Sequence, residues 1–125
     1  MKLTTLGALL SLFIFAYAAP GEAVGPILNH CIFSWSEDST VTDLRNFFVK
    51  ISTVPGGPYT VLASIPATTG GTFVTVNLCA GQSQGQKYAV VTAVDLASNE
   101  SGVSNEVPFV YDTAVPSAPA NFKVQ

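Results

Sequence analysis

Few residues in this chain have side chains that commonly carry out chemistry. His30 is the single histidine, and it directly precedes Cys31, the first of two cysteines. A zinc or copper centre needs several such ligands, and a Ser-His-Asp triad needs a histidine beside a nucleophile in a cleft. No catalytic motif surrounds His30, which we expect in solvent at the end of a strand. The sequence therefore predicts a non-catalytic protein without metal or cofactor.

Acidic side chains occur in polar, turn-forming stretches. Glu37 and Asp38 are adjacent and should be solvated, whereas Asp95 and Glu100 lie in the segment DLASNESG. Aspartate in turns usually accepts hydrogen bonds from the local backbone, and this is the role we expect for Asp95. A calcium site built with Glu100 is the alternative. Asn99 begins an Asn-Glu-Ser glycosylation triplet, which a polar turn can also contain by chance.

The two cysteines, Cys31 and Cys79, are candidates for a disulfide in an exported protein. If Cys31 begins one strand and Cys79 ends its antiparallel neighbour, the two positions coincide. Two separate thiols are the alternative, because Val74, Val76 and Leu78 share one face and leave Cys79 on the other.

The first 18 residues have the organisation of a secretory signal. A positive start at Lys2 precedes an apolar core over residues 6–16, and Ala16-Tyr17-Ala18 is a small-x-small cleavage site. A membrane helix needs about 18 or more apolar residues, and this core is shorter. We expect cleavage after Ala18, a secreted protein with no membrane association after cleavage, and a flexible leader over residues 19–26.

The charge balance is mildly acidic. Five basic and eight acidic residues give a net charge of −3, and cleavage would remove Lys2 and no acidic residue. Nucleic-acid binding requires a basic patch for the phosphates. We therefore expect no nucleic-acid partner.

Period-two alternation and turn signals predict an all-β chain. Tyr88 to Asp95 is rich in Val and Thr and is expected to be a strand buried on both sides. The strongest turn signal is Val54 to Pro58. Alternation predicts an inward Phe33 and Trp35 on one strand and Phe47 and Val49 on another. The predicted strands span residues 27–36, 44–53, 59–65, 72–78, 88–95 and 105–111.

The segment TAVDLASNESGVSN, together with Trp35 in IFSWSEDS and Leu78 in TFVTVNL, resembles the fibronectin type III family in its bacterial and phage form. The resemblance covers residues 27–112 and implies an immunoglobulin-like antiparallel β-sandwich of about six or seven strands. It places Trp35, Leu78, Val91 and Ala93 in the core. The link over residues 80–86 is longer than in the family. Such a fold supports many functions and does not specify one.

The family's first strand, roughly Pro-x-x-Pro-x-Asn-Leu-x-Val, is not found before Cys31. A similar pattern occurs in the segment over residues 113–125, at Pro116 to Val124. The tail could open a further domain, or Gly25 to Asn29 could serve as a degenerate first strand. Alternatively, the tail could be donated to a neighbouring molecule by β-augmentation, through Ala118, Asn121, Phe122 and Val124.

These observations predict a spacer or binding and adhesion module at a cell or virion surface, with a protein or polysaccharide partner. Function in such folds usually lies on loops held by a rigid scaffold, here Val54 to Pro58 and a loop containing Asp95, Ser98, Asn99, Glu100 and Ser101. A self-associating subunit is one alternative. A carbohydrate-binding domain with exposed Phe48, Tyr59 and Tyr111 is another.

Overall fold

A computed structural model describes residues 24–67 and 71–125, and within these ranges the regular structure is entirely β. The expected signal peptide, and the expected leader up to residue 23, lie outside the described residues. Over the part described, no helix is long and apolar enough to cross a membrane. The strands are β1 (Ile27–Leu28), β2 (Ser34–Glu37), β3 (Leu44–Ser52), β4 (Thr60–Pro66), β5 (Gly71–Val74), β6 (Gly85–Asp95) and β7 (Val107–Tyr111).

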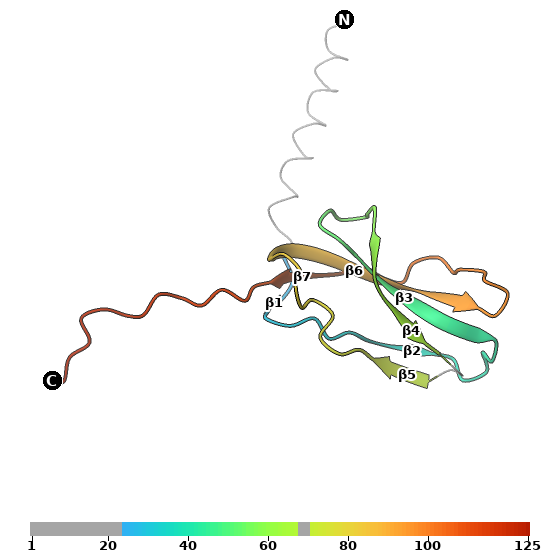
Figure 1. Cartoon of the computed structure of the whole chain (residues 1–125), viewed down its shortest axis with the longest axis horizontal. Helices are drawn as coiled ribbons and strands as arrows, with labels where there is room; N and C mark the ends of the chain where they lie inside the picture. The colour runs from blue at the N-terminus through green and yellow to red at the C-terminus, as the bar shows by residue number, and fades with distance from the viewer. Residues whose placement is uncertain (1–23, 68–70) are drawn as a thin grey trace, which may run out of the picture.

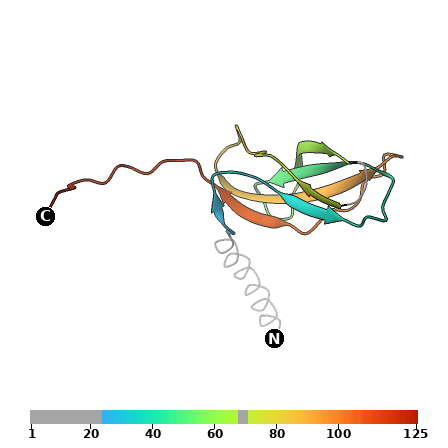
Figure 2. The same cartoon turned by 90° about the horizontal axis from the view of Figure 1, so that it is seen from below.

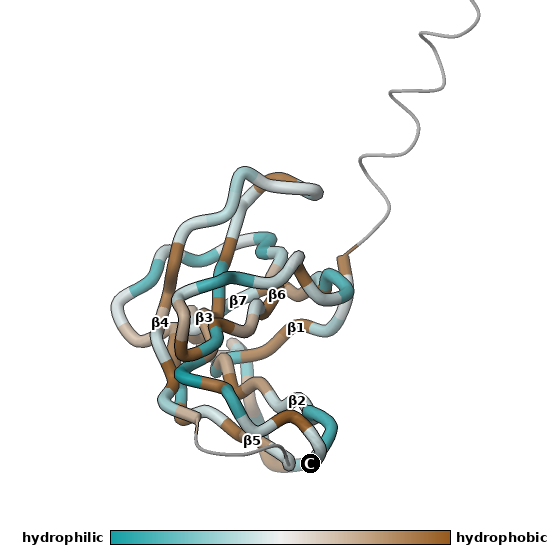
Figure 3. The backbone as a smooth tube through the Cα atoms, turned by 90° about the vertical axis from the view of Figure 1, so that its right-hand side faces the viewer, coloured by the Kyte–Doolittle hydropathy of each residue, from teal (hydrophilic) through white to brown (hydrophobic). Residues whose placement is uncertain are grey.

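The strands form two layers (Figure 1). One sheet has the order β1-β7-β6-β3-β4, and the second consists of β2 and β5. Figure 3 shows β2 and β5 as a separate layer below the larger sheet. The all-β prediction is confirmed, and the arrangement resembles a sandwich.

The core lies between the two layers and follows from the alternation of β3 and β6. Phe47 stands opposite Ala93, and Val49 stands opposite Val91 in the antiparallel ladder. The Trp35 ring of β2 contacts the Phe47 ring edge-on, with centroids 5.2 Å apart. Among the predicted core residues Phe47 and Val49 are fully buried, and the others are half-buried, namely Phe33, Trp35, Leu78, Val91 and Ala93.

The strand β6 is buried on both faces. Val90, Thr92 and Val94, which point away from β2 and β5, are as buried as the core. A strand near the middle of a sheet with both faces covered reads as a nearly continuous run of β-branched and small residues. The predicted burial of this run on both sides is therefore confirmed.

The largest difference from the sequence prediction is at β5, which ends at Val74 instead of continuing to residue 78. Beyond that point side chains take over the acceptor half of the ladder: the Phe33 N–H donates to the Thr75 hydroxyl and the Cys31 N–H donates to the Asn77 amide oxygen. The N–H groups of Thr75 and Leu78 still donate to the carbonyls of Phe33 and Cys31. Val74 and Val76 are exposed, whereas Thr75 is buried. The inward face is therefore shifted by one residue from the prediction, which leaves Leu78 only half-buried.

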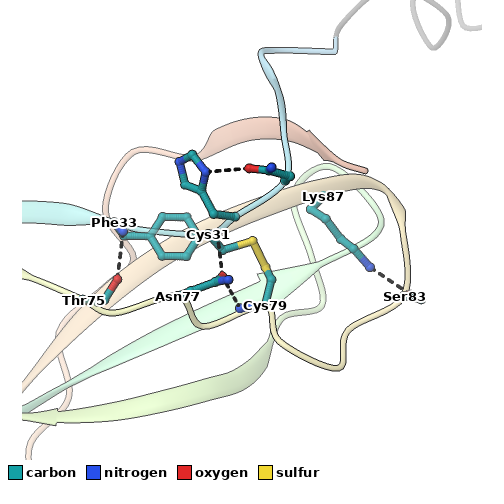
Figure 4. The surroundings of a disulfide bond; sticks show 9 residues. Cys31, Phe33, Thr75, Asn77, Cys79, Ser83 and Lys87 are labelled. Atoms are coloured by element: carbon teal, nitrogen blue, oxygen red, sulfur yellow. Dashed lines mark hydrogen bonds between the residues drawn. A yellow bond between two sulfur atoms is a disulfide. The ribbon is translucent and has the colours of Figure 1, made fainter. Parts of the chain in front are cut away.

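The shifted alternation turns Cys79 inward, and it forms a disulfide with Cys31 (Figure 4). The two Cα atoms are 5.3 Å apart, which suits the bond. Both cysteines are buried in a cluster at one end of the sandwich. The alternative of two separate thiols was based on the wrong phase for this segment. The other members of the cluster are Ile51, Ala89, Phe109 and Tyr111.

The segment before Cys31 does form a strand, but it pairs with β7 and not with β2. Ile27 lies beside Val110 in a parallel register, and the Val110 N–H donates to the Pro26 carbonyl. Gly25 has a φ of +70°, and a Cβ there would lie 2.1 Å from the Pro108 carbonyl oxygen. A residue with a side chain would not fit this close approach. Glycine therefore lets the chain reach β7.

Candidate functional site

The candidate binding loop is a compact turn at the end of β6, at the opposite end of the domain from the tail (Figure 1). One oxygen of the Asp95 carboxylate accepts hydrogen bonds from the backbone N–H groups of Ala97 and Asn99, at 2.9 and 2.8 Å. The other oxygen accepts from the Asn99 side-chain amide at 3.0 Å. Asp95 therefore has the turn-stabilising role expected for it.

Two side chains of β3 form polar contacts with the loop. The Arg45 guanidinium donates to the Ser98 hydroxyl at 2.8 Å. The Lys50 ammonium and the Glu100 carboxylate form an ion pair at 2.5 Å, and the Thr92 hydroxyl donates to the same oxygen at 2.6 Å. The loop is therefore tied to β3 and β6 on both of its sides.

These contacts determine the charge state of the loop. Hydrogen bonds from the side chain and backbone of Asn99 hold the pKa of Asp95 below its ordinary value of 3.8. Hydrogen bonds from Lys50 and then Thr92 hold the pKa of Glu100 below 4.5. Donors around a carboxylate favour its ionised form. Both groups are therefore negative at neutral pH.

The residues that remain free form a small exposed surface. Leu96 is 67% exposed, although its N–H is anchored on the Asp43 carbonyl. Ser98 adopts a left-handed conformation with φ at 70°. The loop thus presents Leu96 and neighbouring polar groups on a fixed backbone.

Neither a metal site nor a histidine centre is formed by these residues. The Asp95 and Glu100 carboxylates are bound to separate donors, and no group of three metal-ligating side chains occurs within the described ranges. His30 is half-buried, and its ring pairs with the Asn29 side chain.

The second predicted loop, Val54 to Pro58, does not join the first. It follows β3, whereas the candidate loop follows β6, and β3 and β6 are antiparallel. It is anchored separately, because the Gly56 N–H and the Tyr59 hydroxyl both donate to Glu106. That bond raises the pKa of Tyr59. The two loops therefore cannot form one binding surface.

The three aromatic residues expected on an exposed face are not exposed together. Tyr111 is 5% exposed and belongs to the disulfide cluster. Phe48 and Tyr59 are half-buried, and the Tyr59 hydroxyl is bound to Glu106. Stacking on sugar requires an accessible aromatic face, and Tyr111 does not supply one. This overturns the expected aromatic surface.

Sequence reasoning missed a groove between the layers. One cavity of about 110 Å³ lies between β2 and β7, with Phe33, Trp35 and Val107 in its lining. A wider one of about 440 Å³ continues along β2 toward Glu37 and the segment over residues 101–105. The only sequence signal was indirect, namely the lack of the family's first strand pattern before Cys31.

The tail over residues 113–125 projects away from both sheets (Figures 1 and 2). At its base, the Thr113 and Ala114 N–H groups donate to the Gln84 side chain. Every residue from Asp112 to Gln125 is exposed. The residues expected in a donated strand, Ala118, Asn121, Phe122 and Val124, therefore do not pack on their own domain.

In comparisons with known proteins, no family model matches the chain, and neither does any curated protein or solved structure.

Proposed function

We propose that this protein is an exported, non-catalytic β-sandwich of the fibronectin type III type that binds a protein at a cell or virion surface through the loop over residues 95–102. The observation that carries the proposal is the bracing of this loop. Asp95 satisfies three donors within it, and contacts from Arg45 and Lys50 fix its sides. A loop fixed before binding loses little conformational entropy when a partner docks.

The chemistry of the exposed groups favours a protein partner. Leu96 supplies an exposed apolar side chain in the same loop as the polar groups of Ser98, Asn99 and Ser101, and protein interfaces combine apolar and polar contacts. The acidic side chains are already paired, so the loop carries no free cluster of charge. The disulfide between Cys31 and Cys79 is compatible with export to an oxidising compartment.

A surface-retention assay tests the loop. The exported protein would be added to cells of the organism that carries the gene, and the amount retained would be measured for the parent and for Leu96→Asp. We expect the substitution to reduce retention about tenfold or more, since a charge at the centre of an interface is left without solvent or partner.

Val76→Asp is the matched control. Val76 is 77% exposed, but it lies after β5 and away from the loop, so this variant should be retained like the parent. Equal retention of both variants would show that the loop makes no contact and would favour a spacer role. Loss of retention in both would assign the effect to added negative charge.

Amino-terminal sequencing tests export separately. The proposal expects the secreted protein to begin at Ala19, after cleavage of the signal. A chain recovered only inside the cell and beginning at Met1 would contradict export without bearing on the loop.

A further inference from the structure

One edge of β2 is free along its whole length. The other edge of β2 pairs with β5. Just before β2, the Phe33 N–H donates to the Thr75 hydroxyl and the Phe33 carbonyl accepts from the Thr75 N–H. Bonded pairs alternate along an antiparallel ladder, so the N–H and C=O groups of Ser34 and Ser36 point to the opposite edge. There they have no partner among the described residues. Such an edge is a template for an added strand.

The free edge borders the groove between the layers. Ser34 and Trp35 line both of its cavities, and the wider one also reaches Ser36 and Glu37. Trp35 has a buried indole N–H without an acceptor in the described ranges. Buried donors are normally satisfied. The groove therefore offers unused backbone groups and an apolar wall, while the indole N–H of Trp35 lies beneath its surface.

The tail has the complementary pattern. From Ala118 onward, one face of an extended chain would carry Ala118, Ala120, Phe122 and Val124, while Pro119, Asn121, Lys123 and Gln125 would lie on the other. Phe122 and Val124 are 96% and 95% exposed. Lys123 is the only charged residue of the segment over residues 113–125, and it lies on the face opposite Phe122 and Val124. The face that would cover the groove is therefore entirely apolar.

We infer that residues 118–124 of one molecule add as a strand to the free edge of β2 in a second copy, with Phe122 and Val124 covering the groove. The donor's tail points away from its own sheets (Figure 2), and its base is fixed by Gln84. The contact is therefore between molecules and joins two different surfaces. A head-to-tail contact of this kind builds a chain of subunits unless it closes into a ring.

Asn121 must change conformation on docking. It has a φ of 57°, which interrupts an extended tail. Asparagine tolerates this left-handed region, whereas a β-branched residue strongly avoids it. Asn121→Val should therefore favour the extended, docked tail, and Asn121→Gly should favour the free one.

Sedimentation velocity over a series of concentrations, with the chain from Ala19 to Gln125, tests the inference. The parent should shift from monomer to larger species as concentration rises. The emission maximum of Trp35, the only tryptophan, should move to shorter wavelength in parallel.

The double variant Phe122→Ser/Val124→Ser should associate about 100-fold more weakly, and Asn121→Val should associate more tightly. Val115→Ser, at an exposed tail position outside the strand, is the control and should match the parent.

Mixing two defective variants tests the direction of the contact. Ser34→Pro removes an edge N–H that is not part of the ladder with β5, a position where proline is tolerated. It should weaken self-association while leaving its tail intact. Combined with the double tail variant, which keeps its groove, it should form heterodimers that neither protein forms alone. A parent that stays monomeric at every concentration, or a double tail variant that associates like the parent, would overturn the inference.

Discussion

At the scale of single residues, Asp95 is the group on which the candidate loop depends most. Its carboxylate binds two backbone N–H groups and one side-chain amide of the loop. The sequence predicted this role because aspartate at the start of a turn commonly does so. The support from Arg45 and Lys50 could not be predicted, since each lies at least 50 residues from its partner in the chain.

The first prediction concerns the titration of this carboxylate. Because its pKa is lowered in the folded state, the stabilisation is present above its ordinary value and is lost as the pH falls through the folded-state value. Carbon-detected NMR should show the Asp95 midpoint below 3.8, with the amide signals of residues 97–99 shifting in step. In Asn99→Ala the midpoint should rise toward that value, and in Asn105→Ala it should not. An Asp95 midpoint at or above 3.8 in the parent would contradict the hydrogen-bonded loop.

The second prediction concerns Lys87, which is 3% exposed and, among the described residues, donates only to the Ser83 hydroxyl, at 3.0 Å (Figure 4). A buried ammonium with one neutral partner is costly. Lys87→Met should raise the free energy of unfolding in urea by about 1–3 kcal/mol. Lys50→Met, which removes the exposed ion pair with Glu100, should instead lower it slightly. A clear loss of stability in Lys87→Met would show that the ammonium has a favourable partner in solution.

At the scale of elements, the central strands were predictable and the smaller sheet was only partly so. β3 has regular alternation, and its predicted span of 44–53 agrees closely with Leu44–Ser52. β6 has a long apolar run, and its predicted end at Asp95 is right, but it begins at Gly85, three residues before the predicted start and inside the predicted link. The predicted extent of β5 was wrong because the side chains of Thr75 and Asn77 accept hydrogen bonds that backbone carbonyls would accept in a regular ladder. The alternation of Val74, Val76 and Leu78 still resembles the buried face of a strand, so the sequence pattern does not reveal this change.

The third prediction contrasts the two sheets. Phe47 packs against Trp35 and Phe73, with ring centroids 5.2 and 4.6 Å away. Phe47→Ala should cost about 3–5 kcal/mol of stability. Val76→Thr, at a position the sequence pattern had placed on the same face as Leu78, should stay within about 0.5 kcal/mol. Chemical denaturation measures both, and comparable losses in the two variants would restore the predicted phase of that segment.

At the scale of the whole molecule, the disulfide joins two segments that are far apart in the sequence and adjacent in the smaller layer. It connects Cys31, before β2, with Cys79, in the segment between β5 and β6, across a separation of 48 residues. The sequence identified both cysteines but left their pairing open, because the pairing depends on the phase of the segment after β5. The position of the first strand also depended on tertiary contacts, since Gly25 brings the chain onto β7.

The fourth prediction is that Cys31→Ser/Cys79→Ser lowers the free energy of unfolding by about 4 kcal/mol, the chain-entropy value for a loop of this length. The measurement is denaturant unfolding of the double variant against the oxidised parent. The reduced parent should lose a similar amount, which controls for the serine hydroxyls. An unchanged midpoint in both would mean that the bond adds nothing to the hydrogen bonds and packing between these two segments.

The central claim is that a loop fixed by hydrogen bonds is held at the end of a two-layered β-sandwich. Amide hydrogen exchange followed by NMR under native conditions tests it most directly, because one experiment measures the protection of the loop and of the sheets. The account predicts slow exchange in the middle of β3 and β6. It also predicts measurable protection at Ala97 and Asn99, and fast exchange at Ser34 and Ser36 in the dilute monomer. Loop amides that exchange as fast as those of an unfolded chain, while β3 and β6 stay protected, would contradict it.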